Sequence, residues 1–572
     1  MDKRLLMVFA LSFLVLLLVQ AWVAKNYKKP AEPQKPATQT AETTQSPTAP
    51  AASETPAQPP VPAGVTKQGK AEETTVIEND LYRITFSNRG AQVKSWILKK
   101  YKDDKGNPLE LVNTLAAEKY GYPLSLYTYD EPLRNKLNSV LYQPSETGSV
   151  KPPGEVTFEY ADGDVSVRKS FRFDNNYEVH VEAAVINKGS EVTAFTMWPS
   201  GFGDQTVPAS YAASRVDWQY QDKIERVAIK KVTNGNTVQG PFEWAGVVDQ
   251  YFAAVFLPEH PDTAAMVTLH NNIEIPKNLD KPDPKDTTKV DVLGAGVGNL
   301  KGPTSQMIFV GPKDVDVLQA VRLPGVQGGN ADLSKLVDFG HYLGWIAKPL
   351  FIWLKWTYNH FWPQNWGWAI IWQTIIINLA LLPLRISSMK SSLKMQKVGP
   401  QMKAIQDKYK KYGMRDPRRA DMQKEIGELY KREGVNPVGG CLPLVVQMPF
   451  LIAYYSMLGV AIELRQASWG WLHDLSSADP YHILPIGIII TTLLVQKMTP
   501  QAGVDPTQQK MMTLMMPLML GFISWNLAAG LCLYWVVGNL IAILIQMIMN
   551  RTSLGQEMRA ELEKRARKKA KV

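Results

Sequence analysis

The residue run IIINLALLPLRISSMK, positions 375 to 390, carries two side chains that are costly in an apolar helix. Asn378 interrupts a hydrophobic stretch, and Arg385 ends it seven residues later. Residues seven apart lie on nearly the same helix face, and Thr374, four residues before Asn378, extends that face. Polar side chains in membrane spans usually face the protein interior or a water-filled space. The aligned hydroxyl, amide and guanidinium therefore predict a hydrated cavity inside a membrane bundle.

Two simpler interpretations apply to the same side chains. Thr374 and Asn378 could make ordinary interhelical hydrogen bonds, worth about 0.6 kcal/mol each. Arg385 could be a flanking residue whose side chain extends to the lipid headgroups. The sequence contains no nucleotide-binding motif, metal-ligand cluster or nucleophile–base pair, and Cys441 and Cys532 cannot build a paired-cysteine site. We therefore expect a protein that is not an enzyme and has no metal or cofactor.

The elements that must position these side chains begin with an apolar run near the N-terminus. This run, positions 5–23, follows Lys3 and Arg4, is longer than the apolar part of a cleavable signal peptide and lacks a good cleavage site. We expect residues 1–25 to be an uncleaved transmembrane anchor with a cytoplasmic N-terminus. Residues 26–71 are rich in Pro, Ala and Thr and predict a disordered tether.

Short segments of alternating hydrophobicity, divided by turns, fill residues 72–325. The segments 81–87 and 91–98 flank one turn, and the segments 155–161 and 165–173 flank another. Strands that are interrupted by turns every ~8–12 residues predict an all-β antiparallel sandwich. Because the anchor starts in the cytoplasm, this domain is expected outside the cytoplasmic membrane.

Helical patterns follow from about residue 330. Residues 330–363 predict an amphipathic helix that lies in the interface on the outer side of the membrane. Lys348 and Lys355 share one face of this helix, and aromatic residues cover the rest. A true span is the alternative for this segment. Residues 364–550 predict a polytopic α-helical core, in which the third span is shorter than the ~20 residues of a straight span. The five expected spans are about 366–384, 442–462, 483–496, 511–527 and 531–549.

Basic residues are concentrated at two places. Residues 385–436 contain 14 Lys or Arg against 6 Asp or Glu, and the basic tail 551–572 contains 8 against 3. The loops expected on the outer side hold a single basic residue, Arg465. The positive-inside bias therefore places both basic segments, and the C-terminus, in the cytoplasm.

The segment 386–436 has two amphipathic stretches divided by Gly413 and Pro417, which predicts a cytoplasmic helical hairpin. Its charge suits ribosomal RNA or anionic lipids, and no DNA contact is expected. A solvated basic face is the simpler interpretation. The residues expected to contact the ribosome or lipid are Lys403, Lys410, Lys411, Arg418, Arg419, Lys568 and Lys569.

Three motifs resemble one known family. NPVGGCLPLVVQMPFLIAYYSML (436–458), AAGLCLYWVVGNL (528–540) and LLPLRISSMKSSLKMQ (381–396) closely resemble the YidC family of membrane-protein insertases. The resemblance is strongest over residues 330–550, and the anchor, tether and β-domain are similar to the layout of the Gram-negative members. It implies a multi-pass protein of the bacterial inner membrane, with nascent membrane proteins as substrates and a Sec-type translocon as partner.

The family also implies a hydrophilic groove that is open to the cytoplasm and carries an arginine on its first core span. Asn378 holds that position here, and Arg385 lies two turns further along the same face. A small-molecule transporter, which would usually show an inverted repeat, and a structural or sensory anchor for the β-domain are the alternative functions. The expected groove residues are Thr374, Asn378, Arg385, Gln447, Met448, Thr492, Tyr534 and Trp535.

Overall fold

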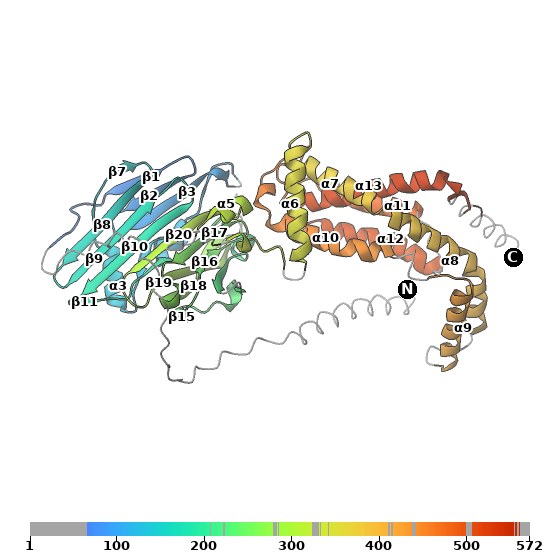
Figure 1. Ribbon diagram of the computed structural model, residues 1–572, viewed down its shortest axis with the longest axis horizontal. Coiled ribbons are helices and arrows are strands. Elements are labelled where there is room, and N and C mark those ends of the chain that lie inside the picture. The colour runs from blue at the N-terminus through green and yellow to red at the C-terminus, as the bar shows by residue number, and fades with distance from the viewer. Residues whose placement is uncertain are drawn as a thin grey trace, which may run out of the picture.

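The computed structural model describes residues 66–560 with short gaps and consists of a β-rich part and a helical part (Figure 1). The predicted anchor (1–25), most of the tether (26–71) and the tail beyond residue 560 lie outside the described residues, as do Lys410, Lys411, Lys568 and Lys569. The gaps are residues 104, 206–207, 221–222, 278–282, 284, 323–330, 332, 341–342, 410–411, 413–415, 437–441, 499–505, 554 and 558–559.

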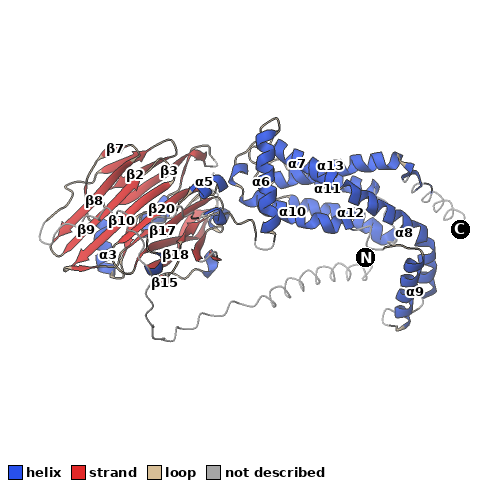
Figure 2. Cartoon of the chain, in the orientation of Figure 1, coloured by secondary structure: helices blue, strands red, loops and turns tan. Residues whose placement is uncertain are grey.

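The β-rich part contains three sheets within the described residues (Figure 2). The first has the order β4 (Pro108–Glu110), β3 (Gln92–Lys102), β2 (Tyr82–Ser87), β1 (Thr74–Glu78) and β7 (Gly148–Val150). The second has the order β14 (Lys223–Ala228), β13 (Arg215–Tyr220), β16 (Trp244–Val248), β17 (Phe252–Pro258), β20 (Thr304–Pro312), β10 (Glu178–Asn187), β9 (Val165–Phe173), β8 (Gly154–Asp162) and β6 (Gln143–Pro144), with β11 (Ser190–Glu191) beside β10. The third has the order β15 (Asn236–Gln239), β18 (Ala264–Pro276), β19 (Thr287–Asn299), β12 (Phe195–Trp198) and β5 (Ser125–Tyr127).

The predicted strands are confirmed, since the four segments singled out in the sequence correspond to β2, β3, β8 and β9. Alternate side chains of these strands point inward, as the period of two requires. Phe86 of β2 meets Phe171 of β9 with ring centroids 4.9 Å apart, and Phe158 of β8 lies 5.7 Å from Phe86. The first and second sheets therefore share an aromatic core.

The prediction of an all-antiparallel, all-β domain is wrong in two respects. Strand β1 pairs in parallel with β7, because the chain returns to that edge only after crossing the domain. Short helices also occur where polar side chains cap a helix start: Asn113 and Asp130 accept hydrogen bonds from the amides of Ala116 and Leu133. The capped helices are α2 (Thr114–Tyr120), α3 (Glu131–Ser139) and α5 (Val315–Ala320), and the other short helices are α4 (Pro208–Tyr211), η1 (Ile229–Lys231) and η2 (Pro261–Thr263).

In the helical part, α6 lies next to the β-rich part and runs across the ends of the other helices (Figure 1). The remaining long helices lie side by side and extend away from the β-rich part, with α8 and α9 at the far end. The elements are η3 (Leu333–Leu336), α6 (Gly344–His360), α7 (Trp366–Ala380), α8 (Leu382–Tyr409), α9 (Arg418–Arg432), α10 (Leu442–Val460), η4 (Ile462–Leu464), α11 (Ile483–Met498), α12 (Pro506–Ser524) and α13 (Ala529–Arg551).

The first expected span, 366–384, is not one straight helix. Helix α7 ends at Ala380, and α8 begins at Leu382 with its axis bent by 49° from α7. Pro383 accounts for the break, because its ring would clash with the carbonyl of Leu379 in a continuous helix and it has no amide hydrogen to donate. Arg385 therefore lies on α8 and not on the helix that carries Asn378.

Helices α8 and α9 pack into the predicted hairpin. Their shared core contains Val398, Met402 and Tyr409 of α8 and Ile426 and Leu429 of α9. These residues recur at spacings of three, four or seven, which places them on one face of each helix. The two helices therefore pack against each other, and the cytoplasmic position of the hairpin stays a prediction.

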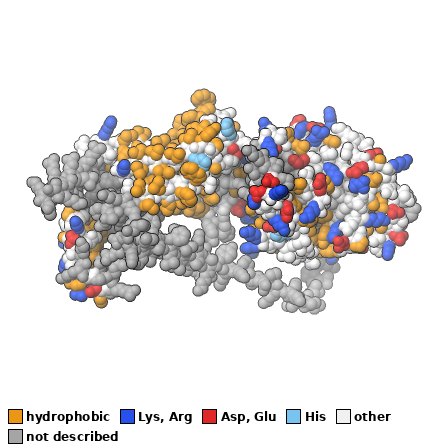
Figure 3. All heavy atoms as spheres, turned by 180° about the vertical axis from the view of Figure 1, so that it is seen from behind, with side chains coloured by type: hydrophobic (Ala, Val, Ile, Leu, Met, Phe, Trp, Pro, Cys, Tyr) orange, Lys and Arg blue, Asp and Glu red, His pale blue; other side chains and the backbone are white. Residues whose placement is uncertain are grey.

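Apolar side chains cover the outside of the bundle between the β-rich part and the far end (Figure 3). Among the described residues, α13 alone is long and apolar enough to cross a membrane, and α7 with the start of α8 passes as a bent pair. Continuous apolar surface of this extent fits lipid and not water. The exposed apolar residues include Ile452, Tyr455, Ile486, Ile490, Leu518, Phe522, Leu544 and Ile548.

Candidate functional site

The three polar residues aligned in the sequence form one connected chain of hydrogen bonds. The Asn378 amide nitrogen donates to the Thr374 carbonyl oxygen at 2.8 Å, and the Thr374 hydroxyl donates to the Ile370 carbonyl oxygen at 2.6 Å. Across the bend, Arg385 Nη2 donates to Asn378 Oδ1 at 2.9 Å. In a straight helix the two backbone positions would lie ~10 Å apart along the axis; here the guanidinium reaches the amide across the bend.

Burial differs along this chain of contacts. Thr374 and Asn378 are fully buried, whereas Arg385 is partly exposed. Gly538 of α13 faces them, and a Cβ atom added there would lie 3.9 Å from Thr374 Cγ2 and 4.0 Å from Asn378 Nδ2. A residue larger than glycine at position 538 would occupy the space between α13 and these two side chains. The polar chain is therefore enclosed at its Thr374 end and meets the surroundings at Arg385.

A second group of polar side chains joins α6, α7, α10 and α13. Gln373 donates to the Leu350 carbonyl oxygen of α6 at 3.1 Å and accepts a hydrogen bond from the Tyr454 hydroxyl. The Tyr454 ring stacks on Tyr534 of α13 with centroids 4.2 Å apart. The Tyr534 hydroxyl is buried without a hydrogen-bond partner among the described residues, and the side chains of Gln447 and Arg385 are close enough to influence it electrostatically.

The remaining expected residues divide between this site and other places. Thr492 pairs with Asn539 of α13, whose amide donates to the hydroxyls of Thr491 and Thr492 at 3.0 Å each. Met448 is 44% exposed on the outside of α10 and takes no part in the polar contacts, and Trp535 is partly buried against the core. The structure therefore brings Thr374, Asn378, Arg385, Gln447 and Tyr534 together and leaves Thr492 in a separate pair.

Two participants were missed in the sequence, namely Gln373 and Tyr454. Gln373 is a second polar residue inside the apolar run, next to Thr374, and that signal was present. Tyr454 reads as an ordinary aromatic residue of a span. Its role depends on the packing of α10 against α7 and α13, which residue spacing within one helix does not reveal.

The basic residues of the hairpin differ in their surroundings. The Lys403 side chain is exposed. Arg418 forms an ion pair with Asp416 at 2.8 Å, and its guanidinium lies over the Tyr412 ring at 3.9 Å from the centroid. The side chain of Arg419 lies outside the described part of the chain.

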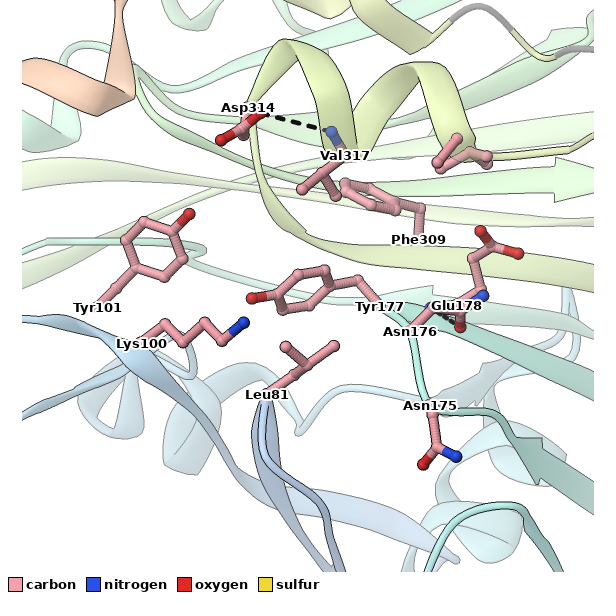
Figure 4. Close-up of a pocket in the computed structure, with 12 residues that line it drawn as sticks. Leu81, Lys100, Tyr101, Asn175, Asn176, Tyr177, Glu178, Phe309, Asp314 and Val317 are labelled. Atoms are coloured by element: carbon pink, nitrogen blue, oxygen red, sulfur yellow. Dashed lines mark hydrogen bonds between the residues drawn. The ribbon is translucent and has the colours of Figure 1, made fainter. Parts of the chain in front are cut away.

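A cavity of about 420 Å³ lies in the β-rich part, between β3, β10 and α5 (Figure 4). Tyr101, Tyr177 and Lys100 point into it, and Glu178 lies at its rim. Burial, and then the nearby Asp174 carboxylate, raise the pKa of Glu178 to about 7. The lining residues include no nucleophile beside a base, and the described residues hold no group of three metal-ligating side chains. We assign no chemistry to this cavity.

The fold and the polar site together define a class: a membrane-embedded helical bundle with internal hydrogen-bonding groups, carrying a large β-rich domain. Two family models cover nearly all of the described chain. The model of the YidC periplasmic domain matches residues 74–353, and that of the 60Kd inner membrane protein matches residues 356–556.

Known proteins are also similar to this chain. The membrane protein insertase YidC of Syntrophus aciditrophicus is 31% identical over 587 residues, covering 96% of this chain and all of that protein. YidC of Geobacter metallireducens is 32% identical, covering 88% of this chain and 90% of its own. A crystal structure of an active YidC insertase aligns at 18% identity with a TM-score of 0.34, covering 85% of this chain and 94% of that one.

The chain belongs to the YidC family of membrane protein insertases. The resemblance drawn from the three sequence motifs is thereby confirmed. As a member, it is an inner membrane protein with a β-rich periplasmic domain and a helical C-terminal region.

Proposed function

We propose that the chain inserts membrane proteins by receiving them at a hydrophilic groove built around Arg385, Asn378 and Thr374. The observation that carries this proposal is the hydrogen-bonded chain from Arg385 to Thr374 inside a bundle whose outer surface is apolar. The family assignment favours this function over a transporter or a sensory anchor.

The physical argument concerns the polar flank of a substrate. Moving an unpaired polar group into hydrocarbon costs several kcal/mol. A cluster of donors and acceptors within the cytoplasmic leaflet lowers that cost, because the flank can exchange water for protein partners. The apolar segment of the substrate then moves sideways into lipid between the helices. Arg385, as the partly exposed member, is the first group that a substrate meets.

The same proposal includes a membrane topology. We infer five spans formed by α7 with the start of α8, α10, α11, α12 and α13, with both chain termini in the cytoplasm. Helix α11 has 16 residues, about 24 Å, and is shorter than a ~30 Å hydrocarbon core. A short span favours local thinning of the bilayer, which shortens the path of a polar flank. Helix α6, with its exposed Trp345 and Trp356, is proposed to lie in the outer interface.

We also infer three partners beyond the substrate. The basic hairpin α8–α9, with exposed Lys403, suits the ribosome and anionic lipids, because phosphate-rich surfaces attract lysine and arginine. A Sec-type translocon is proposed from the family resemblance. The hairpin lies at the end of the bundle away from the β-rich domain (Figure 1), which supports a cytoplasmic position for it.

The groove is tested by replacing its members with apolar residues. In the Asn378→Leu/Arg385→Ala double variant, we expect insertion of substrates with charged translocated tails to slow about tenfold, equivalent to ~1.4 kcal/mol in the barrier. Substrates with neutral tails should slow less, because their desolvation cost is smaller. The measurement is protease protection of substrates inserted into proteoliposomes.

The matched control is Asn550→Leu, which removes the same amide from the end of α13, where its partner is Gln546. That variant should insert both substrates at the wild-type rate. Wild-type insertion of charged tails by the double variant would show that the polar chain is only a packing element.

A further inference from the structure

The periplasmic domain touches the bundle at a second place besides the chain connection through residues 321–343. The segment after α10, η4 and the loop that follows it, contacts the domain directly. Arg465 forms an ion pair with Asp204, and the two side chains are only 5% and 12% exposed. The Arg465 guanidinium also lies over the Phe252 ring of β17, 5.7 Å from its centroid.

Hydrogen bonds to backbone atoms reinforce this contact from both sides. Gln466 Nε2 donates to the carbonyl oxygens of Lys102 and Asp103, at 2.9 and 3.0 Å, at the end of β3. In the opposite direction, Gln250 Nε2 of the periplasmic domain donates to the Gly459 carbonyl oxygen at 2.7 Å, near the end of α10. Gln466 has a φ of 58°, a left-handed conformation that a residue other than glycine seldom adopts. The contact therefore holds the chain in a sharp turn.

The backbone that carries the Asp204 carboxylate is held in place by a buried neighbour. The buried Asp249 accepts hydrogen bonds from the amides of Asp204, Tyr251 and Phe252, at 3.1, 2.7 and 2.6 Å. Gly203 has a φ of 90°, and a Cβ atom there would lie 1.7 Å from Asp249 Oδ2. Only glycine fits at that position, so the backbone that carries Asp204 is fixed by contacts within the periplasmic domain itself.

Helix α6 is tied to the same region by Lys355. Its ammonium group donates to Asp316 of α5 at 2.5 Å and lies 3.9 Å from Glu463 of η4. Lys355 thus links α6, the periplasmic domain and the segment after α10. Helix α6 also accepts the hydrogen bond from Gln373 of α7 through the Leu350 carbonyl, and Gln373 in turn accepts one from Tyr454 of α10, so α6 is connected to both helices.

We propose that Arg465 and Lys355 are positioning residues of the insertase: with Asp204, Glu463 and Asp316 they clamp α6 and the outer end of α10 to the periplasmic domain. The clamp keeps the bundle closed at the outer end. Separation of the helices to admit a substrate is then confined to the inner end, where Arg385 lies. A domain attached to the bundle by one chain connection alone could change its orientation freely, whereas a second attachment point fixes its orientation relative to the bundle.

The proposal rests on the proposed groove function, and its test separates the two. Spin labels at the exposed Lys188 of the periplasmic domain and the exposed Tyr481 before α11 report the orientation of the domain without any substrate. Arg465→Glu and Asp204→Arg, made singly in the full-length protein, each bring like charges together. We expect each to broaden the label-to-label distance distribution and to lower the insertion rate about fivefold.

The double variant Asp204→Arg/Arg465→Glu restores an ion pair of reversed polarity and should recover both the narrow distribution and most of the insertion rate. Lys136→Glu is the control, because it reverses one charge of an exposed ion pair, Lys136–Asp162, elsewhere in the domain. Narrow distributions in both single variants would overturn the clamp. Broad distributions with wild-type insertion would overturn its positioning role, and a double variant as impaired as the singles would show that the substitutions act by local unfolding.

Discussion

Charged side chains in this protein are withdrawn from water in two different ways. Arg385 remains at the edge of its polar chain, where Asn378 supplies an acceptor. Lys169 of β9 is fully buried in the periplasmic domain, where its ammonium group donates to the carbonyl oxygens of Gly90, Ala91 and Leu124 at 3.1, 2.6 and 2.6 Å. Gly90 and Ala91 form the turn between β2 and β3, so one lysine holds a turn together.

Burial lowers the pKa of Lys169 to about 7, and this shift predicts a pH dependence of stability. Between pH 7 and the ordinary lysine pKa of about 10.5, the unfolded chain binds more protons than the folded one, so this group makes the domain more stable as pH rises. Below pH 7 the cost of the buried charge is fully present. In Lys169→Met this dependence disappears, and the three carbonyl oxygens lose their donor, at ~1–3 kcal/mol each.

We therefore expect Lys169→Met to unfold at a lower temperature than the wild type, with a Tm difference that grows from pH 7 to pH 10. Thermal unfolding of the full-length protein, followed by near-ultraviolet circular dichroism, measures it. Lys188→Met, at an exposed lysine, is the control and should leave Tm unchanged at every pH. A Tm difference that is constant across this pH range would contradict the predicted protonation change.

At the scale of elements, the hairpin and the bent span show which parts of the fold could be predicted from the sequence. The hairpin was predictable because Met402, Ile426 and Leu429 recur at helical spacing and every contact is between neighbouring segments. The break at Leu381 was not predicted, because hydrophobicity continues across it to Leu384; only Pro383 marks it. The contacts of Gln373 with α6 and α10 depend on how separate helices pack, and no single segment encodes that arrangement.

The hairpin also carries the prediction on ribosome binding. Removing the basic tail 551–572, or replacing Lys403 and Lys424 with Glu, should weaken co-sedimentation with ribosomes. The loss should be larger at moderate than at low salt, because binding to phosphates depends on released counterions. Lys188→Glu reverses a charge in the periplasmic domain and should change nothing. Unchanged binding at every salt concentration would remove the tail and the hairpin as ribosome contacts.

At the scale of the whole molecule, an apolar belt separates two polar ends (Figure 3). The periplasmic domain is attached at one end through Arg465 and α6, and the basic hairpin lies at the other. Arg385, on α8 after the bend, is the member of the polar chain that lies nearest to the hairpin. An asymmetry follows, since the outer end is fixed by a folded domain while the inner end carries the accessible charge. That arrangement fits a protein that takes its substrates from one side.

Thiol labelling tests this asymmetry after Cys441 and Cys532 are replaced by serine. Among single cysteines at 374, 378 and 385, the one at 385 should react fastest with a membrane-impermeant reagent added from the cytoplasmic side. Those at 374 and 378 should react more slowly, because Thr374 and Asn378 are buried behind Arg385. Cysteines at 376 and 380, on other faces of α7, should react poorly because lipid or neighbouring helices cover them. A cysteine at Gly470, in the loop between α10 and α11, should react only from the periplasmic side. Equal protection of 374, 376, 378, 380 and 385 would mean that water does not reach the polar chain, and a cytoplasmic reaction at 470 would invert the proposed topology.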